Sequence, residues 1–189
     1  MSRRTQIGIL SALVAAACVV QAVAIARAAV PALDAVRFVT SARTIDEIGL
    51  LGFLRYQTEP PLFSLSVWGV HTILVAALGD FREAWALSVQ LAAALPLILL
   101  PIPVFLLSKR LVGPHAALLG TVLVVCLPEI VRLGANGISD STHLLWFSLA
   151  LMLLVLHLSP SDEARLPVLP AWLGGGATAF ALLARSEAF

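Results

Sequence analysis

Residues 84–107 read AWALSVQLAAALPLILLPIPVFLL, and no charged side chain interrupts them. A helix crosses the hydrocarbon core of a bilayer in about 20 predominantly apolar residues, so this stretch is long enough to span a membrane. The rest of the chain is similar: 60% of its 189 residues are hydrophobic, 12% are charged, and the mean hydropathy is +0.98. Soluble domains are about half apolar and about a quarter charged. These values predict an integral membrane protein and exclude a water-soluble globule.

Other apolar stretches follow the same pattern and are too long and uniform for barrel strands. Backbone groups in lipid must be satisfied within the segment, so we expect helices. These stretches are residues 7–30, 61–78, 111–127, 142–158 and 168–183. The predicted fold class is an all-α polytopic membrane protein, a single transmembrane domain over residues 1–189 with about five transmembrane helices. The first stretch also resembles a signal sequence, but its length favours an uncleaved span.

Two basic pairs decide the predicted orientation, because Lys and Arg concentrate in cytoplasmic loops. Arg3-Arg4 precede the first stretch, and Lys109-Arg110 follow residues 84–107. If residues 61–78 crossed the membrane, the second pair would fall outside. The polar side chains of that stretch favour a juxtamembrane helix instead, which places both pairs inside. We therefore expect a multi-pass protein with a cytoplasmic N-terminus, an extracytoplasmic loop with juxtamembrane helices over residues 31–83, and an outer loop over residues 128–140.

Two acidic residues stand beside membrane ends on the expected outer face. Asp34 opens an amphipathic pattern, and Asp140 comes just before residues 142–158. Each carboxylate could simply cap a helix. His143 follows Asp140 at helical spacing and could share a metal ion with it, but the sequence offers no third ligand.

Two further classes of site are disfavoured by the residues. Cys18 and Cys126 lie inside apolar stretches, which predicts buried small side chains without a disulfide or metal role. The net charge is +1, and no basic run is longer than a pair. This pattern excludes nucleic acid as a partner.

Several short motifs occur in an order that resembles a known family. They are Asp34 in the first outer loop, Thr58-Glu-Pro-Pro-Leu-Phe63, Arg132-Leu-Gly-Ala-Asn-Gly-Ile-Ser-Asp140 and Leu182-Leu-Ala-Arg-Ser-Glu-Ala-Phe189. This order resembles the GT-C superfamily of polytopic glycosyltransferases. It is most similar to family 39-like bacterial relatives of protein O-mannosyltransferases and of the aminoarabinose transferase that modifies lipid A. Such enzymes continue for several more spans, so the chain resembles their N-terminal portion.

The resemblance implies an activity and a set of site residues. The activity is transfer of a sugar from a polyprenyl-phosphate donor to a hydroxyl of a lipid or protein acceptor, at the outer face of the bacterial inner membrane. Asp34 matches the catalytic base, and Asp140 would position the acceptor or a divalent cation; no other cofactor is implied. Arginine suits a leaving lipid phosphate, because its guanidinium binds phosphate in a bidentate manner. The candidate donor-phosphate or substrate-binding residues are Arg37, Glu59, Arg132, Arg185 and Glu187.

Two other classes of protein stay open. A transporter or channel subunit would carry ionisable residues near mid-span, and the predicted spans contain essentially none apart from His71. A non-catalytic membrane scaffold fits the short chain.

Overall fold

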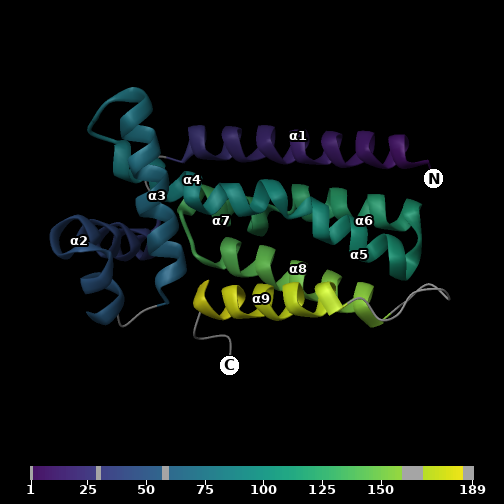
Figure 1. Cartoon of the computed structure of the whole chain (residues 1–189). Coiled ribbons are helices and arrows are strands. Elements are labelled where there is room, and N and C mark those ends of the chain that lie inside the picture. The colour runs from purple at the N-terminus through teal and green to yellow at the C-terminus, as the bar shows by residue number, and fades with distance from the viewer. Residues whose placement is uncertain (1, 29–30, 57–59, 159–167, 185–189) are drawn as a thin grey trace.

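The computed structural model describes residues 2–28, 31–56, 60–158 and 168–184. This part of the chain is helical and contains no strand, which confirms the predicted all-α class (Figure 1). Its nine helices are α1 (Arg3–Arg27), α2 (Leu33–Tyr56), α3 (Pro61–Leu78), α4 (Ala84–Leu99), α5 (Pro101–Val112), α6 (Pro114–Cys126), α7 (Pro128–Asn136), α8 (Asp140–Leu158) and α9 (Val168–Ala184).

Four helical runs in the described residues are long and apolar enough to cross a membrane. They are Arg4–Arg27, Pro61–Leu78, Ala84–Val112 and Asp140–Leu158. The helices α6 and α7 pass the same test as a pair bent by 46°, which raises the number to five. The apolar stretches in the sequence therefore located these helices correctly.

The run from Ala84 to Val112 stays continuous although it contains three prolines. Leu100, between α4 and α5, keeps helical angles (φ −52°, ψ −37°). Its N–H donates to the Pro96 carbonyl at 2.9 Å, and the Val104 N–H donates to the Leu100 carbonyl at 3.3 Å. These bonds carry the helix past Pro101, whose missing N–H is tolerated at a first helical position.

The structure corrects two sequence-based boundaries. Gly113 adopts φ +86° and ends α5, so α6 begins at Pro114 and not at residue 111. Residues 128–140, expected as an outer loop, are not irregular, because the first nine of them form α7. Leu127 is extended before Pro128, as a residue preceding proline prefers, and the proline then starts a new helix.

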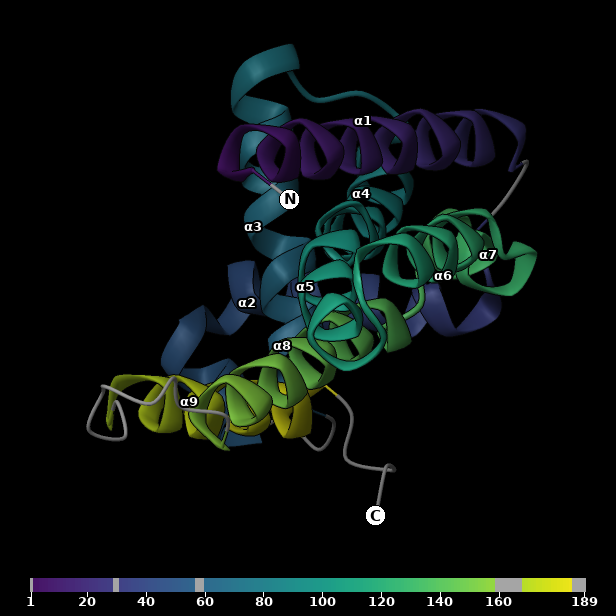
Figure 2. The ribbon, with the colours of Figure 1, turned by 90° about the vertical axis from the view of Figure 1, so that its right-hand side faces the viewer.

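The helices α2 and α3 lie across one end of the bundle. In Figures 1 and 2 α3 stands upright in both views, crosswise to α4 and α5, which run horizontally in Figure 1. Because α3 and the Ala84–Val112 run point in such different directions, they cannot both stand along one membrane normal. This arrangement favours the prediction that residues 61–78 lie along the membrane surface.

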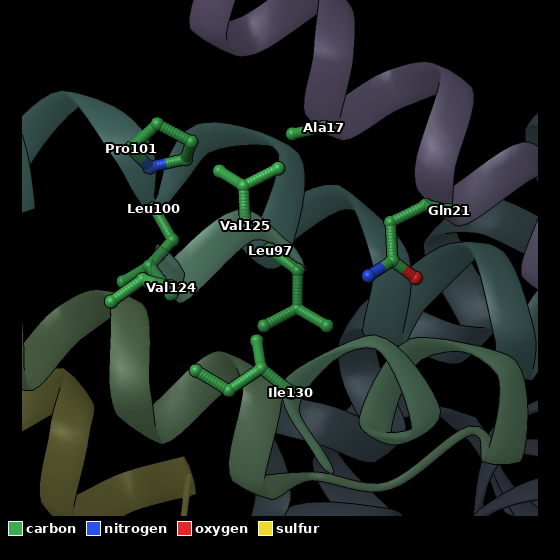
Figure 3. Close-up of a pocket in the computed structure, with 8 residues that line it drawn as sticks. All are labelled: Ala17, Gln21, Leu97, Leu100, Pro101, Val124, Val125 and Ile130. Atoms are coloured by element: carbon green, nitrogen blue, oxygen red, sulfur yellow. The ribbon is translucent and has the colours of Figure 1, made fainter. Parts of the chain in front are cut away.

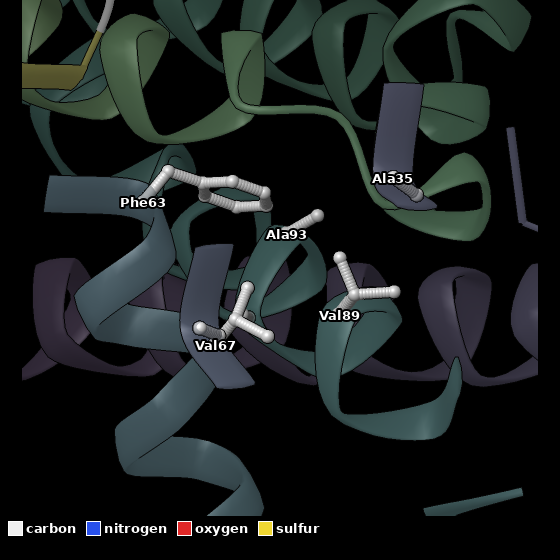
Figure 4. Close-up of a cluster of buried hydrophobic side chains, with 7 residues drawn as sticks. Ala35, Phe63, Val67, Val89 and Ala93 are labelled. Atoms are coloured by element: carbon white, nitrogen blue, oxygen red, sulfur yellow. The ribbon is translucent and has the colours of Figure 1, made fainter. Parts of the chain in front are cut away.

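An apolar cluster attaches α2 and α3 to α4 (Figure 4). Ala35 and Ala42 of α2 meet Phe63 and Val67 of α3 and the small face of α4 around Val89, all buried. The Phe38 and Phe63 rings pack edge to face with their centroids 4.7 Å apart. A kink at Gly49, with φ +74°, separates this packed first part of α2 from its second part. The start of α2 is therefore fixed against α4.

The opposite end of the bundle carries the two basic pairs. The Lys109 ammonium at the end of α5 donates a hydrogen bond to Gln6 Oε1 near the start of α1 at 2.8 Å. This bond brings the segments of Arg3-Arg4 and Lys109-Arg110 to the same end of the bundle. We call this the basic end, and the other the α2–α3 end.

The middle of the bundle contains a buried amide. Gln21 of α1 is 3% exposed, and its Oε1 has no hydrogen-bond partner. Its side chain lies beside an apolar cavity of about 10 Å³ that also touches Leu97, Val125 and Ile130 (Figure 3).

The two cysteines do not contribute to the core. Both are free and exposed, so the prediction that they are buried was wrong. The apolar runs that contain them are exposed on faces of α1 and α6 that the described helices leave uncovered.

Candidate functional site

The turn between α7 and α8 organises the α2–α3 end of the bundle. Gly137 follows α7 with left-handed angles (φ +70°, ψ +42°). Its N–H donates to the Gly134 carbonyl at 3.0 Å, and the Ile138 N–H donates to the Leu133 carbonyl at 3.1 Å. This pair of bonds is a Schellman motif, in which glycine is favoured because it adopts positive φ at little cost. The motif ends α7 sharply and allows α8 to begin at Asp140.

Two contacts fix this turn to the rest of the fold. The Gln90 side-chain amide of α4 donates to the Ala135 carbonyl at 2.8 Å in a buried position. The Ala32 N–H, just before α2, donates to the Asn136 carbonyl at 3.0 Å. A carbonyl at a helix end needs such a partner, because the helix itself supplies none. The turn is thereby joined to both α4 and the start of α2.

The approach of α2 to the turn is very close. A Cβ atom at Gly137 would lie 3.2 Å from the Ala35 Cβ and 3.1 Å from the Val89 methyl groups. Ala35 faces inward and is 1% exposed, and its neighbour Asp34 is exposed in the first turn of α2. Asp140 is the first residue of α8 and is half-buried. Two acids distant in the sequence are therefore carried by helix starts that meet at a single turn.

Two arginines of the predicted site lie in the described residues, one on α2 and one on α7. Arg37 lies one turn after Asp34 on α2 and is exposed. Arg132 lies on α7, one turn before Asn136, and pairs with Glu129 at 3.5 Å on the surface. Exposed pairs of this kind contribute little to stability, so Arg132 could exchange Glu129 for another anion. Glu59, Arg185 and Glu187 lie outside the described residues.

His143 lies in the first turn of α8 but contacts α9. Its Nδ1 is 3.0 Å from the Ala181 carbonyl, and its ring stacks on Phe147. Within the described part of the chain, no three His, Cys, Asp or Glu side chains come together as a metal site. The metal pairing of Asp140 with His143 therefore gains no third ligand there.

Sequence reasoning missed a polar and aromatic cluster at the same end of the bundle. The His71 and Trp85 rings are stacked with centroids 3.5 Å apart, and the Arg43 guanidinium lies 5.2 Å from the centroid of Trp85. Beside them the Trp68 indole N–H donates to Asp46 at 2.8 Å. The spacing of Arg43 and Asp46 puts both on one face of α2, but no sequence signal pairs that face with α3 and α4.

His71 is the member of this cluster whose pKa is shifted. Its Nδ1 is 3.3 Å from Ser88 Oγ, which in turn donates to the Ala84 carbonyl at 2.6 Å. Burial lowers the pKa of His71 below its usual value, and Asp46 and Asp80 oppose this shift.

The acids and arginines around the α7–α8 turn could together accept a proton and bind an anion. A carboxylate in a helix start can act as a base, and arginines at the same end can neutralise a phosphate. No protein-family model, curated protein or solved structure matches the chain.

Proposed function

We propose that the chain is a GT-C-type membrane glycosyltransferase module, which transfers a sugar from a polyprenyl-phosphate donor to an acceptor hydroxyl. One observation carries the proposal: the helix starts of Asp34 and Asp140 meet at the α7–α8 turn, through the Ala32–Asn136 hydrogen bond and the Ala35–Gly137 approach. The motif order in the sequence supplies the reaction class. The outer face of a bacterial inner membrane is the proposed location.

The proposed roles follow from charge and position. Attack on the anomeric carbon makes the acceptor hydroxyl more acidic, and Asp34 takes its proton. Asp140 positions the acceptor or a divalent cation. The lipid phosphate leaves as an anion, so it needs positive charge more than a proton. Arg37 and Arg132 are the described side chains proposed for that role.

Residues outside the described part of the chain complete the proposal. Glu59, Arg185 and Glu187 belong to the same motif set and would contact donor or acceptor. The apolar helix surfaces would hold the prenyl chain, which explains why this chemistry needs a membrane protein.

The test is sugar transfer in membranes that contain the protein. Asp34→Asn should reduce transfer from a polyprenyl-phosphate-linked sugar by about 10²–10⁴-fold, the usual contribution of a positioned base. Asp80→Asn is the matched control, because Asp80 is an exposed acid between α3 and α4 with no role in the proposed site. Both variants should keep the wild-type unfolding temperature. Undiminished transfer by Asp34→Asn would remove that residue from the base role.

One observation favours the transporter alternative. Gln21 is a buried amide with an unpaired oxygen, and the cavity beside it is also lined by residues on both sides of the bend between α6 and α7. Discontinuous helices with buried polar groups are typical of substrate sites in transporters. The adjacent cavity of about 10 Å³ holds no more than one water molecule, which weighs against a substrate. Solute uptake into vesicles that is lost in Gln21→Leu and kept in Asp34→Asn would favour this alternative.

A further inference from the structure

A groove of about 340 Å³ opens at the basic end of the bundle. It lies between α1, α5 and α8, away from the α7–α8 turn, and its volume falls in the range of about 300–1,000 Å³ typical of small-molecule sites. Its lining residues are Gln6, Leu106, Lys109, Arg110 and Leu156. Nothing in the proposed sugar transfer uses this groove.

The groove wall contains a positioned ammonium group. Lys109 is half-buried, and one of its N–H groups is bonded to Gln6 Oε1 at 2.8 Å. An ammonium has three donors, so this bond fixes the group and leaves two donors for a ligand. Arg110 also lines the groove, and Arg4 is exposed on α1 near Gln6.

The surrounding helices carry no opposing charge at this end. The sequences of α1, α5 and α6 contain no Asp or Glu, and the only acid of α8 is Asp140 at its other end. Within the described residues the Lys109 ammonium therefore has a neutral partner, Gln6, and no carboxylate partner, so its positive charge can attract an anion.

The apolar surface around the groove identifies the anion. Leu106 and Leu156 form part of the lining itself. Large apolar side chains near this end of the same helices are exposed, namely Ile7 at 55%, Leu111 at 65% and Leu158 at 67%. A soluble phosphate would gain nothing from these side chains, whereas the acyl chains of a lipid would cover them.

We infer that the groove binds the headgroup phosphate of an anionic phospholipid, with Lys109 as its main contact and the acyl chains against Leu106 and Leu156. This inference is independent of the proposed sugar transfer, because it concerns the opposite end of the bundle and its test measures binding. Basic pockets between membrane helices bind anionic headgroups in the same manner.

The experiment compares phosphatidylglycerol with phosphatidylcholine of identical acyl chains, added to the full chain in neutral detergent. Binding is followed by native mass spectrometry and by the unfolding temperature. The wild type should bind phosphatidylglycerol more tightly. Lys109→Gln should weaken that binding about fivefold, as expected for one basic residue near an anionic lipid. Arg27→Gln, which removes one exposed charge at the other end of α1, should leave it unchanged.

Two further arms make the result decisive. Lys109→Arg keeps the charge and should keep the lipid preference, which separates charge from any folding effect of Lys109→Gln. Inorganic phosphate should neither stabilise the protein nor compete with phosphatidylglycerol at equal concentration. Equal binding of the two lipids, equal losses in Lys109→Gln and Arg27→Gln, or full competition by inorganic phosphate would each overturn the inference.

Discussion

The contact of α7 with α1 and α4 can be tested at Gly134. A Cβ atom at this position would collide with Gln21 Oε1 and would lie 3.0 Å from Gln21 Cδ and 3.3 Å from the Ala94 Cα. The Gln21 side chain is only 3% exposed, so it has to be displaced within the core, and the Ala94 backbone can yield only if α4 and α7 separate. Overpacking of this kind costs about 1–3 kcal/mol. Gly134→Ala should therefore lower the free energy of unfolding by that amount, although alanine is the better helix former.

Gly120 provides the matched control. It lies inside α6, and a Cβ atom there would meet nothing within 4 Å. Gly120→Ala should leave stability unchanged or raise it by up to about 1 kcal/mol, from helix propensity alone. The measurement is thermal unfolding of the purified protein in detergent. A change of 1 kcal/mol corresponds to about 2–4 °C in Tm for a chain of this size.

A double-mutant cycle identifies the group that Gly134 accommodates. Gln21→Ala removes both the Oε1 and the Cδ that a new Cβ would meet, and it leaves the Ala94 contact. The cost of Gly134→Ala should fall by about 1 kcal/mol or more in that background, within the usual coupling range for residues in contact. If Gly134→Ala is as stable as Gly120→Ala, or if Gln21→Ala gives no rescue, the close packing of α1, α4 and α7 is wrong.

Three other predictions follow from the same structure. Gln90→Leu should lower stability by about 1–3 kcal/mol, measured by thermal unfolding, because it leaves the buried Ala135 carbonyl without its donor; the exposed substitution Arg27→Gln should not. The pKa of His71 is lowered in the folded protein, so the unfolded chain binds more protons just below the usual value of 6.5. The free energy of unfolding should therefore be highest above that pH and decrease as the pH falls below it. His71→Phe should remove this pH dependence. If the pH profile of His71→Phe is the same as that of the wild type, the dependence does not come from His71. Single cysteines at positions 34 and 140, in a background without Cys18 and Cys126, should react with an impermeant thiol reagent from the same side, and a cysteine at position 109 only from the other; labelling of 34 and 140 from opposite sides would also refute the proposed site.

The sequence determined the helices of this protein and which residues stand near their ends. Long runs without charge, such as residues 84–107, form helices in a membrane, because in lipid every backbone group must find a partner within the segment. The same local logic anticipated the bounds of α3, because a proline pair starts it and Gly79 ends it. The two basic pairs likewise predicted one shared end, which the Lys109–Gln6 hydrogen bond joins in the structure.

Only the tertiary structure decided which of these segments meet. Residues 128–136 are polar enough to suggest a loop, but they form α7 because Gly134 lets that helix pack against Ala94 and because Gln90 binds its last turn. The junction of α2 with the α7–α8 turn rests on Gly137, which has room for Ala35 only because it lacks a side chain. Such contacts join residues about 40 to 100 positions apart, and hydrophobic spacing describes only neighbours within one element. For that reason the two acids could be named from the sequence, whereas the meeting of their helix starts, and the cluster of Arg43, His71 and Trp85 beside them, appear only in the folded chain.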